Sequence, residues 1–263
     1  MTPKQAYDDV SRRARLLLKL HDGLTDTRRR GIRNDWRRSF CRFMRWNQTA
    51  AISRVDTRDA LIILRDGASL RSNDLSREAL ADLLRSSLTI GVSAVDRYVH
   101  ERVVKNVVKA LKRSNLNSSQ RDFSIPAALT IRLAGTIARG KNSVQRGRRR
   151  RQVRPANEIR KAIQELLHRR PLQNWREIQQ AFELIGIQGF DGKLQTRYHV
   201  GNISAIRSLL GKVVERRNYI VHEGDLVRHE RGGRVRHRPL ARKYVEDSLD
   251  FLDAFVGHLD AIS

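Results

Sequence analysis

The stretch SREALADLLRSSLTIGVSAVDRYVHERVVKNVVKALKR, residues 76–113, decides the fold class of this chain. Its apolar residues recur at three- and four-residue intervals, which is the period of an α-helix. Asp74 or Ser76 stands where a helix N-cap is expected. The middle of the stretch, LTIGVSAV (88–95), is apolar all round and therefore belongs at the centre of a bundle. The sequence predicts one long helix that other helices surround.

The rest of the chain has the same helical character. Period-two alternation is almost absent, and no repeat of solenoid length is present. Pro155 fits the first position of a helix, and Gly140, Gly186 and Gly224 fit helix ends. We therefore expect an all-α protein. The further helices predicted are 3–22, 57–67, 127–140, 155–168, 174–186, 202–222 and about 239–262.

Residues 28–46, RRRGIRNDWRRSFCRFMRW, mix arginines with aromatic side chains. Trp36, Phe40 and Phe43 follow the spacing i, i+4, i+7, so they share one face of a helix. One interpretation is a core stripe with the arginines on the solvated face. The other is an RNA-contacting surface on which some aromatic rings stack on bases.

The charge of the chain points to a polyanionic partner. Lys and Arg total 53 against 28 Asp and Glu in 263 residues, a formal charge of +25. Nucleic acid is favoured over an acidic membrane surface, because no basic amphipathic helix of the membrane-anchoring type is evident. The densest basic run lies at 145–158 and is either a solvated loop or an RNA-backbone contact. Its candidate RNA-binding residues are Arg148, Arg149, Arg150, Arg151 and Arg154, to which Arg216 is added from another segment.

Several classes of site and of location are not expected. The single cysteine, Cys41, cannot form an internal disulfide, which fits a reducing compartment. The first residues lack a signal-peptide layout, and no apolar run approaches the ~18 residues that span a bilayer. HExxH, paired CxxC and Walker-type motifs are missing. We expect a cytoplasmic protein without a cofactor or a catalytic metal.

The stretch VVERRNYIVHEGD, residues 213–225, gathers the most reactive side chains. Asn218 and His222 are four residues apart, so they lie on one face of a helix, and Arg217 lies about 100° round from Asn218. We expect Ile220 and Val221 to pack inward on the face of Arg217. An arginine directed toward a packed face needs an anionic partner, from the protein or from a ligand.

An arginine and a histidine suffice for one reaction in particular. RNA carries its own nucleophile, the 2′-OH, from which a histidine can remove the proton, or it can protonate the leaving 5′-oxygen. An arginine can stabilise the charge that builds up on the phosphorane. The alternative is that Arg217 and His222 only cap the helix and pair with Glu223 or Asp225.

RRNYIVHEGD resembles the signature of the HEPN superfamily, in which an arginine, a polar residue and a histidine close a bundle helix. The fuller pattern RN-x-IVHEGD resembles the RiboL-PSP branch of that superfamily. LLRSSLTIGVSAVDRYVHERVV resembles the first core helix of the branch, and NWREIQQAFELIGI followed by FDGKL matches its layout. The resemblance covers roughly residues 75–260. It implies a HEPN-type helical bundle with additional N-terminal helices.

The resemblance also implies a function. Many HEPN domains are metal-independent endoribonucleases that dimerise and bring two motifs into one cleft, and they act as toxins, antiviral effectors or RNA-processing enzymes. Arg217 would stabilise the phosphate, Asn218 would orient the histidine or the phosphate, and His222 would be the acid or base. Asp96 and Glu101 are candidates for an acid that holds Arg217 or His222, with Glu223 and Asp225 as further supporting residues.

The expected partners follow from this function. They are RNA, a second copy of the chain that completes the site, and an antitoxin or activating protein; no membrane is expected. Two domains are expected, a basic helical extension at 1–70 and the HEPN-like bundle at 71–263, with a basic loop at 141–155. The alternatives are a non-catalytic RNA-binding module and a subunit of a larger ribonucleoprotein on the same fold.

Overall fold

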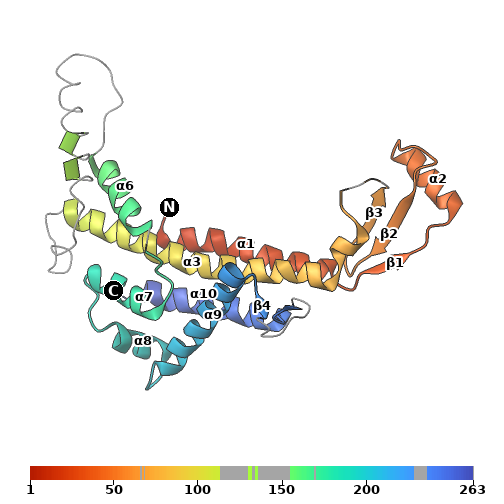
Figure 1. Ribbon diagram of the computed structural model, residues 1–263. Helices are drawn as coiled ribbons and strands as arrows, with labels where there is room; N and C mark the ends of the chain where they lie inside the picture. Colours follow the sequence, from red (N-terminus) through yellow and green to blue (C-terminus); the bar gives the residue numbers. More distant parts are fainter. Residues whose placement is uncertain are drawn as a thin grey trace, which may run out of the picture. The chain divides into compact units, whose positions relative to one another are not determined.

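The computed structural model describes residues 1–65, 67, 69–112, 130–131, 134–135, 155–168, 170–227 and 236–262. The chain is largely helical, as the periodicity of its apolar residues predicts (Figure 1). The helices are α1 (Pro3–Leu24), α2 (Asn34–Phe43), α3 (Arg77–Lys112), α6 (Pro155–His168), α7 (Trp175–Leu184), α8 (Phe190–Tyr198), α9 (Ser204–Glu223) and α10 (Arg242–Ala261). A 3-10 turn, η1 (Ser72–Leu75), precedes α3.

The long helix predicted at 76–113 is α3, and its cap is Ser76. The Oγ of Ser76 accepts a hydrogen bond from the backbone N–H of Ala79 at 3.3 Å. Leu88, Val92, Ala94 and Val95 in its middle are buried, so the stretch that is apolar all round does lie in the core. Of the predicted helix at 127–140, only 130–131 and 134–135 are described, and these are helical; most of the basic run at 145–158 lies outside the described residues.

The chain forms two compact units, and α1, α3, α9 and α10 each contribute to both. The first unit consists of Met1–Val10, Val92–Asn218 and Phe251–Ser263. Aromatic side chains fill its core: Phe182, Phe190 and Phe255 are buried, and the ring of Trp175 lies 5.5 Å from that of Phe190 and 6.0 Å from that of Phe255. Tyr98 is also buried and donates its hydroxyl to Asp260 at 3.0 Å.

The second unit consists of Ser11–Gly91 and Tyr219–Asp250. Leu84, Leu88, Val245 and Leu249 are buried in it. A hydrogen bond joins two of its helices: the hydroxyl of Ser87 on α3 donates to the carbonyl of Ala14 on α1 at 2.8 Å. The domain boundary expected near residue 70 stays a prediction.

Strands within the second unit correct the expectation that the N-terminal segment is wholly helical. β1 (Arg28–Arg30), β2 (Ile52–Asp56) and β3 (Leu61–Arg65) form an antiparallel sheet in the order β1-β2-β3, and Val55 pairs with Ile62. The helix predicted at 57–67 is therefore wrong. Thr57 turns the chain instead, because its Oγ1 accepts from the N–H of Ala60 at 2.9 Å and donates to the carbonyl of Gly23 at 2.8 Å.

Helix α2 confirms the predicted helical spacing of the aromatic residues but not the core stripe. Phe43 is 82% exposed and Trp36 is 40% exposed, whereas Cys41 is buried. Cys41 lies about 140° round the helix from Trp36, so the buried face is not the face of the aromatic pair. Figure 1 shows α2 beside the three strands, and we call residues 28–65, which comprise β1, α2, β2 and β3, the basic module.

A second, smaller hairpin follows α9. It pairs β4 (Leu226–Val227) with β5 (Arg236–His237) in antiparallel register. Among the described residues, every helix is too short or too polar to cross a membrane.

Candidate functional site

Arg217, Asn218 and His222 all lie on α9, in the last turns before the helix ends at Glu223. The helix is continuous here, so its period fixes their relation: Asn218 and His222 share a face, and Arg217 lies about 100° away. Arg217 and Asn218 are half-buried, and His222 is exposed. The structure thus brings the three predicted catalytic residues to one end of one helix.

Arg217 stands where the pattern of α9 calls for an apolar residue. The buried side chains of the helix are Leu210, Val213 and Val214, and Arg217 is the next position of that series, seven residues after Leu210. Its Nε is enclosed and has no acceptor among the residues that the structure describes. Its Nη1 donates to the side-chain oxygen of Asn218 at 3.1 Å. Within those same residues no carboxylate pairs with Arg217, so its positive charge is not neutralised.

The same series shows where the sequence interpretation was wrong. Val221 follows Arg217 on this face but is 45% exposed, and Ile220 is half-buried. The fully buried part of α9 ends about two turns before Val221, at Val214. Val221 itself lies in the last turn before Gly224 ends the helix with a φ of 60°. Periodicity predicts which face a residue occupies but not how far the neighbouring element extends.

The turn after α9 is held by a buried ion pair. Asp225 is fully buried, and its Oδ2 accepts from Nε of Arg85 on α3 at 2.8 Å. Burial alone disfavours the Arg85 cation, but its hydrogen bonds to Asp225 and to the exposed Asp82 outweigh burial and raise its pKa. The backbone of Asp225 is bonded on both sides, its N–H to the carbonyl of Tyr219 at 3.0 Å and its carbonyl to the N–H of Arg238 at 2.7 Å.

Arg238 completes this turn. Its guanidinium lies 4.1 Å from the ring centre of Tyr219 and 4.0 Å from the carboxylate of Glu223. The acids Glu223 and Asp225 thus contact Arg238 and Arg85, two residues that the sequence interpretation missed. Arg85 carried only a weak signal, because it directly follows Leu83 and Leu84 but shares that part of α3 with Asp82, Ser86 and Ser87.

The other two supporting acids have partners of their own in the first unit. Asp96 accepts from the N–H of Leu172 at 2.5 Å and lies 3.3 Å from Nδ1 of His100. Glu101 is buried and pairs with Arg97 at 2.9 Å and with Arg160 at 2.8 Å. The contacts of Asp96 and Glu101 are those of acids that join helices and loops of the bundle.

Of the six arginines predicted to bind RNA, the structure describes one. Arg148, Arg149, Arg150, Arg151 and Arg154 lie outside the described residues. Arg216 is described and is half-buried on α9, next to Arg217.

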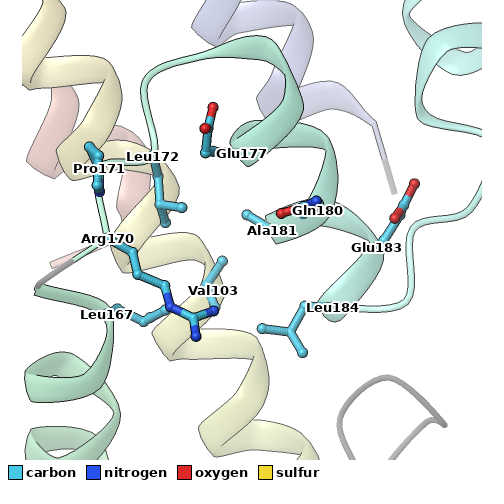
Figure 2. A pocket seen from close by; sticks show the side chains of 10 residues that line it. All are labelled: Val103, Leu167, Arg170, Pro171, Leu172, Glu177, Gln180, Ala181, Glu183 and Leu184. Atoms are coloured by element: carbon cyan, nitrogen blue, oxygen red, sulfur yellow. The ribbon is translucent and has the colours of Figure 1, made fainter. Parts of the chain in front are cut away.

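A pocket of about 440 Å³ opens in the first unit (Figure 2). Its apolar wall includes Val103 of α3, Leu172 and Leu184, and its charged side chains are Arg170, Glu177 and Glu183. None of the three candidate catalytic residues lines it. The pocket therefore supplies no argument about the chemistry of α9.

Compared with known proteins, the chain matches no protein-family model, no curated protein and no solved structure.

Proposed function

We propose that this chain is a metal-independent endoribonuclease of the HEPN type. The observation that carries the proposal is the environment of Arg217, a half-buried cation in an apolar series with no carboxylate partner in the described part of the chain. Burial of an unpaired charge is costly, so such a position favours a ligand that brings its own negative charge. The phosphate of RNA is an anion of this kind, and the +25 charge of the chain attracts it.

The proposed reaction needs no group beyond the chain and its substrate. The 2′-oxygen forms a bond to the adjacent phosphorus while the bond from phosphorus to the 5′-oxygen breaks. A base takes the proton of the 2′-OH, an acid protonates the 5′-oxygen, and Arg217 stabilises the charge of the phosphorane. Asn218, which bonds Arg217 through its side-chain oxygen, would orient the guanidinium toward the phosphate. The products are a 2′,3′-cyclic phosphate and a 5′-OH.

The acid and the base in this scheme are both histidines. One imidazole cannot accept and donate in the same step, so a homodimer that brings two copies of His222 into one cleft would supply both roles. The HEPN resemblance of RRNYIVHEGD supports this arrangement, and it also supports a role as a toxin or antiviral-defence effector with an antitoxin or an activating partner.

The test is cleavage of labelled RNA in EDTA, with the product ends mapped. We expect the His222→Ala variant to lose about 100-fold or more of the cleavage rate. Because His222 is exposed, its melting temperature should stay that of the wild type. His199→Asn is the matched control, since His199 is an exposed histidine outside α9 in a left-handed conformation that asparagine tolerates. Cleavage that survives in His222→Ala, or that persists on RNA carrying a 2′-deoxy residue at the cut site, would contradict the mechanism.

A mixing experiment tests the composite cleft. Refolding the wild type together with an excess of His222→Ala chains produces mixed dimers that hold only one His222. If the cleft needs a histidine from each chain, these mixed dimers are inactive, so activity should fall below the share of wild-type chains in the mixture. Activity that stays proportional to the share of wild-type chains contradicts a shared cleft while leaving cleavage by a single chain open to the first test.

The second candidate function is RNA binding without catalysis. The exposed aromatic and arginine side chains of the basic module favour it, because they suit RNA whether or not α9 is catalytic. The two functions separate in the same assay. A binding module leaves RNA intact in the wild type as well as in His222→Ala, whereas the enzyme cleaves it only in the wild type.

A further inference from the structure

The basic module has an arginine content that its own acids cannot balance. Residues 28–65 contain eleven arginines and three aspartates. One of these aspartates, Asp56, already pairs with both Arg30 and Arg54, at 2.9 and 2.6 Å. Among the described residues, only Arg30 and Arg54 of the eleven form ion pairs. Six of the other nine are exposed and make no side-chain hydrogen bond or ring contact with a described residue: Arg28, Arg33, Arg38, Arg42, Arg45 and Arg58. The basic module therefore carries a large net positive charge.

Aromatic rings stand among these arginines. The rings of Trp36 and Phe40 are stacked at 4.9 Å, and the ring of Trp46 meets that of Phe40 edge-on at 5.8 Å. The guanidinium of Arg65, at the end of β3, lies 5.5 Å from the centre of the Trp46 ring. This row of rings ties α2 to the sheet and fixes the orientation of the helix.

Phe43 has no part in that row. It is 82% exposed, although an exposed phenylalanine adds nothing to folding. It lies on nearly the same face of α2 as Trp36, about 10 Å further along the helix axis by the rise of 1.5 Å per residue. Two exposed rings at this separation can each take up a separate base of one strand.

We infer that the basic module binds single-stranded RNA. Phe43 and Trp36 stack on bases, and the unpaired arginines contact phosphates. A single strand is favoured over a duplex because its bases expose their faces, whereas paired bases stack on one another. The inference adds to the proposed endoribonuclease a site that would hold the substrate. It rests on that proposal only for the choice of RNA, since it concerns residues other than those of α9.

The experiment measures binding of the full chain to a fluorescently labelled single-stranded 2′-O-methyl RNA of mixed sequence. This ligand keeps its bases and phosphates but offers no 2′-OH, so cleavage does not interfere. The decisive variants are Phe43→Leu, which keeps an apolar side chain and removes the ring, and Phe43→Tyr, which keeps the ring. We expect Phe43→Leu to weaken binding about tenfold and Phe43→Tyr to stay close to the wild type, because stacking depends on the π-face.

Met44→Ala is the matched control for the aromatic variants. Met44, the residue directly after α2, is exposed but has no ring, so its loss should leave the affinity unchanged. Quenching of tryptophan fluorescence by the RNA gives an independent readout, and the Trp36→Phe variant should lose part of the quenching while it still binds.

The charge contribution is tested by salt dependence. For the variant that carries both Arg38→Ala and Arg42→Ala, the slope of log affinity against log salt should fall by about 1.4, at about 0.7 for each phosphate contact to a single strand. Arg12→Ala, which removes an exposed arginine of α1, should leave the slope unchanged.

Three results would overturn the inference. The first is wild-type affinity in Phe43→Leu, and the second is a loss in Met44→Ala as large as in Phe43→Leu. The third is a duplex that binds as tightly as the single strand. Failure of the nuclease proposal has a different signature, because a chain that cleaves no RNA can still bind the 2′-O-methyl strand through Phe43.

Discussion

Arg85 and the unpaired arginines of the basic module lie in the same compact unit, but their surroundings are opposite. Arg85 is buried against Asp225, and a second acid, Asp82, contacts it from the surface. Arg38 and Arg42 are exposed and have no acidic partner among the described residues. The comparison teaches that a charge of +25 contains two populations of arginine, one that stabilises the fold and one that is left for a ligand. Four substitutions test this division, in order of decreasing effect on stability.

The largest effect is expected for Asp225→Asn. The change keeps the size of the side chain and the left-handed backbone at φ 59°, which asparagine adopts readily. It removes the buried counter-charge of Arg85, so that only the exposed Asp82 remains paired with it. Breaking one side of a buried pair costs about 3 kcal/mol or more. The free energy of unfolding in urea measures it.

Asp82→Asn is the control for this prediction. Asp82 bonds the same arginine, but its side chain is 70% exposed, so its loss should cost about 0–1 kcal/mol. Equal losses of unfolding free energy in Asp225→Asn and Asp82→Asn would show that burial does not decide how much each acid contributes to stability.

The second effect is expected for Glu101→Gln in the first unit. Glu101 is buried, while its partners Arg97 and Arg160 are about half exposed and can turn to water. We expect a loss of about 2 kcal/mol for the acid, within the range for hydrogen bonds to charged groups. Arg97→Ala should cost clearly less, because the remaining Arg160 still neutralises the carboxylate. A larger loss of unfolding free energy in Arg97→Ala than in Glu101→Gln would show that the stability of this region does not depend on the buried carboxylate of Glu101.

The sequence predicted the helices for a definite physical reason. In α3, α7, α9 and α10 the apolar period runs for nearly three turns or more. α3 begins at its cap Ser76, and α7 and α9 end beside Gly186 and Gly224, so local pattern and final structure agree. Leu61–Arg65 has no such length. Four consecutive apolar residues fit a strand or a helix equally, and the turn at Thr57 and pairing with β2 decide between them.

The candidate site was predictable to a similar limit. The positions of Arg217, Asn218 and His222 at the end of one helix follow from spacing alone. The pairing of Asp225 with Arg85 does not, because the two residues are 140 positions apart in the chain and meet only after folding. Single-sequence periodicity contains no information on such contacts.

The third effect, smaller again, is expected for Asp22→Asn. Arg242 of α10 binds Asp22 of α1 through Nε at 3.0 Å and Nη2 at 2.8 Å, but both side chains are partly exposed, so the pair should contribute about 1 kcal/mol or less. The hydrogen bond from Arg242 holds the pKa of Asp22 below its usual value of 3.8. The unfolded chain therefore binds the proton first as the pH falls below about 3.8.

This sign predicts a pH dependence. The contribution of the pair is complete above the unfolded pKa and disappears as the pH falls through the lower, folded one. The difference in unfolding free energy between the wild type and Asp22→Asn should thus be present at pH 6 and shrink toward zero in strong acid. Asp247→Asn, which removes an exposed acid paired with Lys243, should show little difference at either pH. A difference in unfolding free energy between the wild type and Asp22→Asn that grows as the pH falls would contradict this prediction.

The smallest effect on stability is expected for the variant that carries both Arg38→Ala and Arg42→Ala, although its effect on RNA binding should be large. Replacing both Arg38 and Arg42 by alanine removes no carboxylate contact within the described part of the chain, and alanine favours the helix slightly more than arginine does. Removing two like charges from a crowded positive surface also relieves repulsion. The unfolding free energy should change by about 0.5 kcal/mol at most.

The comparison depends on this last result together with the salt titration. Residues whose replacement leaves the stability unchanged but lowers the affinity for the 2′-O-methyl strand serve a ligand rather than the fold. If the double variant instead unfolds as easily as Asp225→Asn, these arginines belong to the structural population, and the stability of the basic module then depends on contacts of Arg38 and Arg42. Exposed cations raise the energy of the folded state unless an anion covers them. Unchanged stability of the double variant, together with its lower salt slope, therefore means that the ligand and not the protein supplies the negative charge.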